Sequence, residues 1–279
     1  FDPYVYKSIS TGLSYGVFQL ESEGMRSFMK KLFSDVPAKI AKITRKYGVS
    51  GFGEFASRKN EDYEAEMEAL GRDFFDRIIA GISLYRPGPM DYIDDYLNGL
   101  KKPDDITYDD PMLESILSKT YGVIVYQEQV MDIVKKLAGF TAGQSDTIRK
   151  AMGKKIQELL DEFKPYFIYG SGDAIDPNTK QPFGIKGCIA NGVPEDVATR
   201  LWAKMERFGE YAFNKSHACV YAVITIVCAW LKYYYPCEYM TSLLNTYIED
   251  DKMKAYLGII KSLMHINIIP PGINHSDAY

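Results

Sequence analysis

The helical character of this chain is clearest in residues 21–33, which read ESEGMRSFMKKLF. Apolar residues recur there at the spacing i, i+3, i+4, i+7 and i+8, which places them on one face of a helix. They are Met25, Phe28, Met29, Leu32 and Phe33. Ser22 stands just upstream, where a side-chain oxygen can cap the helix. We therefore expect an amphipathic helix that packs on a core.

The same periodicity extends along the chain, and strand signals are few. It predicts one helix over residues 72–84, ended by Pro87, and another over residues 130–137, closed by Gly139. Only the run Val123–Tyr126 favours a short strand. The segments 34–71 and 170–186 have the composition of surface insertions, the second of them a loop. The predicted fold class is mainly α, a multi-helix domain with a few short strands.

Composition limits the class of protein. The chain has 279 residues, 46% of them hydrophobic, and a net charge of −4, so it can bury a core and is not coated in positive charge. The four cysteines form no C-x-x-C pair, which disfavours metal and disulfide frameworks and favours a reducing, cytoplasmic setting. The chain starts at Phe1 and stops at Tyr279, and we expect both ends to be cut points in a longer protein.

The longest apolar run extends from Ala218 to Leu231. It carries no charge but is shorter than the roughly 20 residues that cross a membrane. We therefore expect a buried core helix and no membrane partner.

The first candidate site is the basic stretch around Gly153. On a helix, Ile148 and Met152 would face the core and leave Arg149 and Lys150 on the open side. Arginine binds phosphate oxygens with its fork, lysine adds point charge, and glycine allows close approach to the backbone. Lys154 and Lys155 complete the cluster. A solvated helix face explains the spacing equally well.

The second candidate site is the helix start at Phe213-Asn214-Lys215-Ser216-His217. Ser216 is the predicted N-cap, and the free amides of the first turn would attract an anion near Lys215 and His217. Tyr221 follows His217 by one turn, so both could contact a phosphate, sugar or base. A capping histidine with a core tyrosine is the alternative.

Three further motifs favour structural roles. Residues 16–22 (GVFQLES) and 121–131 (YGVIVYQEQVM) place Gln and Glu where an apolar stretch meets a helix. We interpret both as buried hydrogen-bond networks, with polar contacts to a DNA backbone as the alternative. The turn Arg86-Pro87-Gly88-Pro89 stops a helix and displays one arginine.

Taken in order, these motifs resemble the fingers region of C-family DNA polymerases, the family of bacterial DNA polymerase III alpha subunits. The resemblance covers the chain from about Val5 to Asn274. It rests on residues 16–22, 84–90 (LYRPGPM), 121–131, 149–155 (RKAMGKK), 213–218 (FNKSHA) and 234–240 (YYPCEYM). It implies that residues 1–270 form the fingers region and that residues 271–279 begin a linker.

The resemblance also implies a binding site for the incoming deoxynucleoside triphosphate. Its residues would be Arg149, Lys150, Lys154, Lys155, Asn214, Lys215, Ser216, His217 and Tyr221, with Gln19 and Arg86 as additions. The family usually has two arginines where this chain has Arg149 and Lys150, so a point charge replaces one fork.

The chemistry itself is expected to lie elsewhere. Nucleotidyl transfer uses carboxylates that hold Mg²⁺, and in this family those aspartates lie in the palm. The resemblance therefore implies no catalytic or metal-binding residue in this chain, and we expect the isolated chain to be inactive. Primer–template DNA, deoxynucleoside triphosphates and other replisome subunits are the implied partners. The alternative function is a non-catalytic helical module that binds DNA or a replisome subunit.

Overall fold

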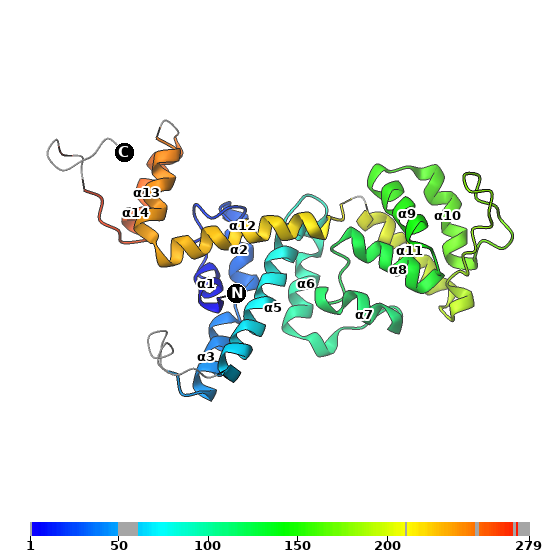
Figure 1. Ribbon diagram of the computed structural model, residues 1–279, viewed down its shortest axis with the longest axis horizontal. Helices are drawn as coiled ribbons and strands as arrows, with labels where there is room; N and C mark the ends of the chain where they lie inside the picture. Colours follow the sequence, from blue (N-terminus) through cyan, green and yellow to red (C-terminus); the bar gives the residue numbers. More distant parts are fainter. Residues whose placement is uncertain (1, 50–60, 210, 249–250, 270–271, 273–279) are drawn as a thin grey trace. The chain divides into compact units, whose positions relative to one another are not determined.

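Helices dominate the computed structural model, which describes residues 2–49, 61–209, 211–248, 251–269 and 272 (Figure 1). The α-helices are α1 (Pro3–Ser10), α2 (Glu23–Leu32), α3 (Val36–Lys46), α5 (Glu61–Leu84), α6 (Ile93–Lys101), α7 (Glu114–Leu117), α8 (Gln127–Ala138), α9 (Ala142–Lys154), α10 (Gln157–Tyr169), α11 (Glu195–Gly209), α12 (Lys215–Tyr234), α13 (Pro236–Thr246) and α14 (Lys252–Ser262). Short 3-10 helices are η1 (Pro89–Tyr92), η2 (Pro103–Asp105), η3 (Pro111–Leu113), η4 (Ser118–Thr120) and η5 (Ile189–Asn191). The mainly α fold class is confirmed.

The expected short strands are not confirmed. Within the described ranges, pairing outside helices is limited to two isolated bridges, Tyr126 with Phe213 and Ile175 with Pro182. Residues 123–126 are buried, but the segment beside them is a brief connection between α11 and α12. A connection this short supplies too few backbone partners for a ladder.

The chain divides into two compact units. Unit 1 comprises Phe1–Arg77 and Tyr221–Tyr279, and unit 2 comprises Ile78–Val220. The divisions fall within α5 and within α12. The predicted linker over residues 271–279 lies outside the described residues except for Gly272.

An aromatic cluster stands at the core of unit 1. The ring of Tyr6 in α1 lies 5.9 Å from that of Phe33 and 5.5 Å from that of Phe74, centroid to centroid. The predicted stripe of α2 is buried, and the Ser22 hydroxyl accepts a hydrogen bond of 3.3 Å from the Met25 amide. Both predictions for this helix are therefore confirmed.

Segment 34–71 is more than a surface insertion. It contains α3, which packs against α1, and the α3 side chains Val36 and Ile40 are buried. These residues are one turn apart, so they share the helix face that joins the core. Part of this segment therefore contributes to the core of unit 1, and its assignment as an insertion stays a prediction.

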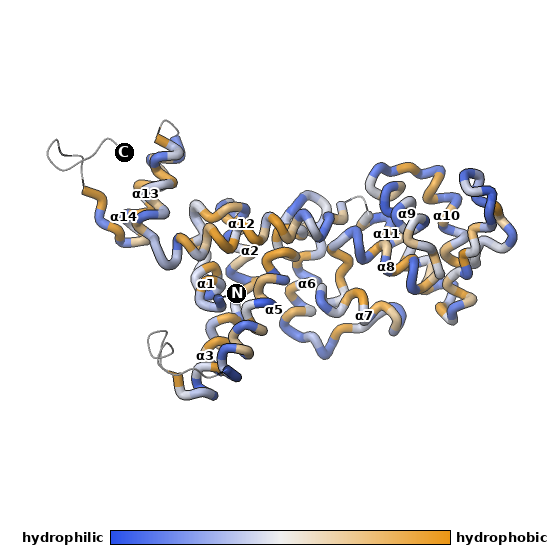
Figure 2. The backbone as a smooth tube through the Cα atoms, in the orientation of Figure 1, coloured by the Kyte–Doolittle hydropathy of each residue, from blue (hydrophilic) through white to orange (hydrophobic). Residues whose placement is uncertain are grey.

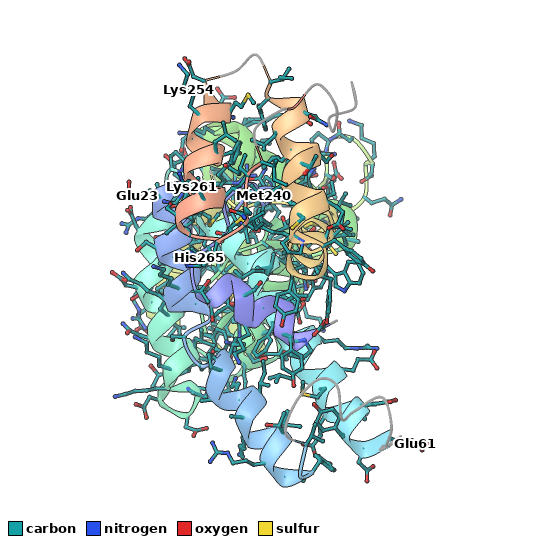
Figure 3. All side chains as sticks on the ribbon, turned by 90° about the vertical axis from the view of Figure 1, so that its left-hand side faces the viewer. Glu23, Glu61, Met240, Lys254, Lys261 and His265 are labelled. Carbon is teal, nitrogen blue, oxygen red and sulfur yellow. The ribbon has the colours of Figure 1, made fainter. Side chains whose placement is uncertain are left out.

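A second, smaller apolar cluster in unit 1 joins α13 and α14. Met240 of α13 and Tyr256 and Ile260 of α14 are its buried members. Figure 3 looks onto this pair, with Met240 beside α14 and Lys254 pointing outward at the far end of α14. The Tyr239 hydroxyl donates a hydrogen bond of 2.6 Å to the Gly16 carbonyl, which ties α13 to the turn before α2.

Unit 2 is built on α8, α9, α10 and α11, which pack against one another. The Trp202 ring of α11 is fully buried and lies 5.3 Å from the Phe167 ring of α10. Gly139 ends α8 in the left-handed conformation with a φ of 79°, as its position after the apolar stripe predicts. Residues 170–186 contain no helix, so the predicted loop is confirmed.

The helix α12 differs most from its prediction. It has 20 residues and continues beyond the apolar run at both ends. Lys215, Ser216 and His217 extend it at the start, and Lys232, Tyr233 and Tyr234 extend it at the end. Figure 2 shows hydrophobic residues along much of its length, yet many are exposed: Val220 by 59% and Val227 by 51%. The prediction of a short buried core helix was therefore wrong. By length and composition α12 is the one helix in the described ranges that could cross a membrane, which alone is weak evidence for a span.

Candidate functional site

The last turns of α9 carry the first predicted cluster. Ile148 and Met152 are buried beneath them, and this turns the intervening residues toward the open side. Arg149 is half-buried there, whereas Lys150 is exposed. A Cβ added at Gly153 would meet no atom within 4 Å. The predicted division of α9 into a core face and a basic face is confirmed.

Two further lysines close this helix. Lys154 is the last residue of α9, and Lys155 is its C-cap in the left-handed conformation with a φ of 55°. Both are exposed. The Lys155 ammonium lies 5.9 Å from the ring centroid of Tyr211. The end of α9 therefore presents cations beside an aromatic ring.

Asp146 pairs with the two foremost cations of the cluster. Its carboxylate lies 2.8 Å from Arg149 Nη2 and 2.7 Å from Lys150 Nζ. Hydrogen bonds from Lys150 and Arg149 lower the pKa of the Asp146 carboxyl below its ordinary value. The side chains are thus held together before any ligand arrives, and an anion would have to share them with Asp146.

The start of α8 links α9 to the start of α12. Arg149 Nη1 donates a hydrogen bond of 3.2 Å to Gln127 Oε1, and the Gln127 amide donates one of 3.1 Å to the Phe213 carbonyl. The Lys215 amide donates to both oxygens of Glu128, at 3.1 Å each. The adjacent residues Gln127 and Glu128 therefore connect the basic cluster of α9 with the start of α12.

Gln129 completes this junction as a structural residue. Its Oε1 accepts hydrogen bonds from the amides of Val125 and Tyr126, at 2.8 and 2.9 Å, and its Nε2 donates to the Thr120 hydroxyl. The side chain is buried. This network agrees with the structural role predicted for residues 121–131.

The cap of α12 is Asn214 rather than Ser216. The helix begins at Lys215, and Asn214 Oδ1 accepts a hydrogen bond of 2.9 Å from the His217 amide. Ser216 lies exposed in the first turn. Both residue types make good caps, and the residue that directly precedes the first helical one takes the role. The prediction for Ser216 was therefore wrong.

Two backbone amides in the first turn of α12 already have hydrogen-bond partners. The amide of Lys215 is bound to Glu128 and that of His217 to Asn214, so neither is available to a phosphate. The side chains remain exposed or half-buried. Lys215 Nζ lies 5.3 Å from the Tyr126 ring centroid, and the His217 ring meets Phe213 edge-on at 5.2 Å. The side chains of Lys215 and His217 are therefore better placed than their own amides to contact an anion.

The Arg86–Pro89 turn joins the same surface. The Arg86 guanidinium carbon lies 3.7 Å from the Phe213 ring centroid, which is a close cation–π contact. Gly88 has a φ of 97°, and an added Cβ would fall 2.4 Å from the Tyr211 ring. Arg86 therefore lies with the predicted residues of unit 2.

Gln19 and Tyr221 belong to unit 1. Gln19 is exposed with a φ of 65°. The ring of Tyr221 lies 5.3 Å from that of Phe18. Tyr221 is also one turn after His217 on α12. This ring contact packs Tyr221 against the residue that precedes Gln19 in the chain.

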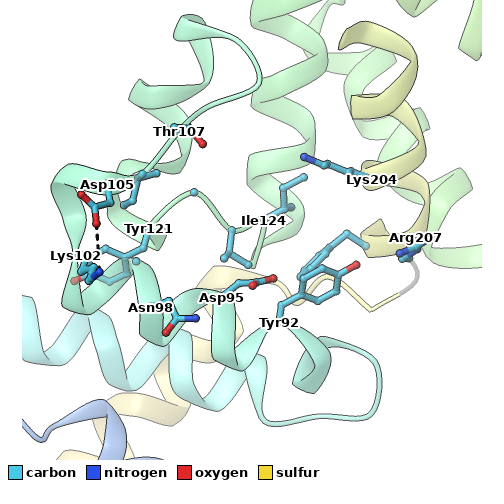
Figure 4. Close-up of a pocket in the computed structure, with 15 residues that line it drawn as sticks. Tyr92, Asp95, Asn98, Lys102, Asp105, Thr107, Tyr121, Ile124, Lys204 and Arg207 are labelled. Carbon is cyan, nitrogen blue, oxygen red and sulfur yellow. Dashed lines mark ion pairs between the residues drawn. The ribbon is translucent and has the colours of Figure 1, made fainter. Parts of the chain in front are cut away.

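A pocket of about 550 Å³ also lies in unit 2 (Figure 4). Lys204 and Arg207 of α11 and Asp95 and Asn98 of α6 are among the side chains lining it. None of the predicted site residues lines this pocket. The predicted cluster and the pocket are therefore separate features.

The described residues do not fit a magnesium site. Magnesium takes carboxylate oxygens in near-octahedral geometry, and no group of three or more His, Cys, Asp or Glu side chains in the described part of the chain is placed to hold a metal. Asp91, Asp94 and Asp95 are exposed at η1 and α6. No step through a metal is derived from these residues.

Neither Asp146 nor Tyr211 was predicted as a site residue, and Gln127, within residues 121–131, was predicted to have only a structural role. Asp146 precedes Arg149 and Lys150 by three and four residues, a spacing that brings side chains together on a helix and could have identified it. Gln127 and Tyr211 join the cluster through tertiary contacts, so the local sequence does not show that they belong to it.

Comparison with known proteins identifies the family of this chain. Residues 1–68 and 64–174 match the family described as bacterial DNA polymerase III alpha subunit finger domain. The chain is 36% identical over 280 residues to the DNA polymerase III subunit alpha of Aquifex aeolicus, a match that covers 99% of this chain and 19% of the relative. The corresponding protein of Campylobacter jejuni is 37% identical over 98% of this chain and 18% of its own length.

That of Chlamydia trachomatis is 33% identical, again over 99% of this chain and 18% of the relative. The chain thus spans about a fifth of the length of these curated relatives. Both the profile of the family and the extended similarity to these alpha subunits lead to one assignment. The chain belongs to the bacterial DNA polymerase III alpha subunit finger-domain family.

Proposed function

We propose that this chain is the fingers portion of a longer DNA-directed DNA polymerase and binds the triphosphate of the incoming deoxynucleotide. The binding residues are Arg149, Lys150, Lys154 and Lys155 on α9, together with Asn214, Lys215, Ser216 and His217 at the start of α12. Arg86 lies on the same surface of unit 2. For Tyr221 and Gln19, which belong to unit 1, a contact with the sugar or base stays a prediction from the family resemblance.

One observation carries this proposal. Gln127 contacts both Arg149 and the Phe213 backbone, while Glu128 binds the Lys215 amide. A solvated helix face needs no such connection between α9 and α12. A ligand site does, because the groups that grip one phosphate chain must keep fixed positions relative to one another.

The side chains divide the work by their chemistry. Arg149 can hold two phosphate oxygens with its planar fork, and Asp146 fixes the orientation of that fork in advance. Lys150 adds a compact charge, and Gly153 leaves the α9 backbone open to approach. Asp146 offsets part of this positive charge, so the exposed Lys154 and Lys155 are proposed to supply the rest of the attraction for a triphosphate.

The remaining parts of the reaction lie outside these residues. Magnesium held by carboxylates elsewhere in the polymerase would neutralise the triphosphate and activate the primer hydroxyl. We infer that the chain alone does not polymerise. Primer–template DNA and other replisome subunits are the partners of the longer protein, which acts in the cytoplasm and not at a membrane.

Primer extension by the full-length polymerase tests the triphosphate site. We expect Arg149→Ala to lower kcat/KM for deoxynucleotides about 10- to 100-fold, because a hydrogen bond to a charged group contributes about 1.5–3 kcal/mol. Lys150→Ala should lose less, since that side chain is more exposed. The matched control is Arg200→Ala on α11, whose guanidinium pairs with Asp196 four residues earlier but lies outside the cluster.

The outcomes separate two functions. A loss confined to Arg149 and Lys150, with an unchanged melting temperature, supports nucleotide binding. If kcat/KM is unchanged while DNA affinity and its salt dependence fall, the chain acts as a helical DNA-binding module instead. The basic surface of α9 supports DNA binding as its function only if these substitutions leave kcat/KM for deoxynucleotides unchanged.

A further inference from the structure

An exposed tyrosine stands beside the basic cluster without a role in the site described above. Tyr211 lies between the end of α11 and the start of α12, and 43% of its surface is exposed. Ala212 next to it is buried, and Phe213 is half-buried. The chain therefore turns Tyr211 outward while its neighbours anchor the segment.

The Tyr211 ring lies against the backbone of Gly88. An ideal Cβ at Gly88 would fall 2.4 Å from Cγ, 2.6 Å from Cδ1 and 2.7 Å from Cδ2 of Tyr211. The ring thus occupies the space that any other residue would need. Gly88 also has a φ of 97°, which side chains rarely permit. The turn is built so that an aromatic ring can lie on its backbone.

The same turn fixes the neighbouring aromatic residue. Arg86 stacks on Phe213 at 3.7 Å. The Phe213 amide donates a hydrogen bond of 3.4 Å to the Val125 carbonyl, and its carbonyl accepts one of 3.1 Å from Gln127. The amides of Tyr211 and Ala212 both donate to the Phe208 carbonyl, at 3.0 and 2.7 Å. The Tyr211 backbone is therefore held on both sides.

The ring is next to the proposed phosphate-binding cations. Lys155 Nζ lies 5.9 Å from its centroid, and Lys155 itself is fixed as the C-cap of α9. A nucleotide whose phosphates contact Lys154 and Lys155 would bring its base or sugar toward Tyr211. A preorganised exposed ring binds at a low entropic cost.

We propose that the Tyr211 ring is the surface against which the base of the incoming deoxynucleotide packs. This rests on the proposed function, since the cations of α9 must hold the triphosphate. Stacking tolerates every base because each has a π-face. Tyr211 therefore positions any of the four bases and does not select one of them.

The test uses primer extension by the full-length polymerase with two substitutions at this position. Tyr211→Leu removes the aromatic face, and we expect kcat/KM for all four deoxynucleotides to fall roughly 5- to 100-fold, the range of base–aromatic stacking. Tyr211→Phe keeps the ring and should stay within about threefold of wild type. Melting temperatures of both variants check that the fold is intact.

Inorganic tripolyphosphate serves as a probe that has phosphates but no base. Its inhibition constant should be unchanged in Tyr211→Leu and raised in Lys155→Ala and Arg149→Ala. If Tyr211→Leu leaves kcat/KM unchanged, or weakens tripolyphosphate as much as deoxynucleotide, the stacking role is overturned. If Arg149→Ala and Lys155→Ala affect neither ligand, the proposed triphosphate site itself is overturned.

Discussion

Arg77 shows how one buried charge organises the core of unit 1. Its side chain is almost fully buried, and its Nη1 and Nη2 each lie 2.7 Å from a carboxylate oxygen, of Asp35 and Asp73 respectively. Nη1 also approaches the Leu32 carbonyl at 3.4 Å. A buried guanidinium is stable only when its donors are paired in this way. Asp35, at the start of α3, thereby ties that helix to α5.

The pH dependence of stability should reveal this pairing. Burial opposes ionisation of Asp35, but the hydrogen bond and charge of Arg77, aided by Lys39, outweigh it and lower the pKa of this carboxyl. Because its pKa is lower in the folded state, ionised Asp35 stabilises the fold above its unfolded-state pKa of about 3.9. This stabilisation is lost as the pH falls through the folded-state pKa.

We expect Asp35→Asn to lower the melting temperature of the chain at about pH 6, and the difference from wild type to shrink by about pH 3. The measurement is thermal unfolding followed by circular dichroism. Asp94→Asn, at an exposed aspartate of α6, is the control. A difference that stays constant down to about pH 2 would contradict the role given to the Asp35 charge.

At the scale of single elements, the helix ends decide how the functional motifs are presented. Apolar spacing predicts the existence of α2, α5 and α8 well, because burial of one face is encoded locally. The end of α8 is also predictable, since Gly139 can adopt a left-handed backbone. The start of α12 is not, because the motif offers Asn214 and Ser216 as competing caps.

A pair of substitutions tests which residue caps α12. Asn214→Ala should destabilise the chain by about 1 kcal/mol, because the His217 amide loses its acceptor. Ser216→Ala should change the free energy of unfolding by less than about 0.5 kcal/mol. Denaturant unfolding of each variant gives both values. Equal losses, or a larger one at Ser216, would show that the cap lies where the sequence alone predicts it.

At the scale of the whole molecule, the composition of α12 does not show which of its side chains are buried. Its apolar residues would suit a core, yet Val223, Ile224 and Val227 are about half exposed. Unit 1 buries the opposite side, where Ala222, Thr225 and Ala229 lie. The helix thus packs with small residues and leaves large ones outside, which a hydropathy pattern cannot reveal.

The catalytic capacity of the chain is also a question at this scale. We expect the 279-residue chain to show no template-directed primer extension in the presence of Mg²⁺ and all four deoxynucleotides, because the described residues lack a carboxylate set for the metal. The full-length polymerase in the same assay is the positive control. Extension products that depend on the template sequence would contradict this expectation.

The sequence by itself determined the mainly helical class, the core face of α2 and the two faces of α9. Each follows from contacts within one or two helical turns, and such contacts are written in the local order of residues. The ordered motifs also predicted the family. What their spacing left open was whether the basic stretch of α9 and the start of α12 meet.

Only the tertiary structure decided that question. Gln127 reaches Arg149 across 22 residues, and Glu128 reaches Lys215 across 87. The contact of the Tyr211 ring with Gly88 likewise joins residues of unit 2 that are distant in the sequence. Contacts of this kind depend on how whole helices pack, because each side chain has many possible partners until the backbone fixes its position.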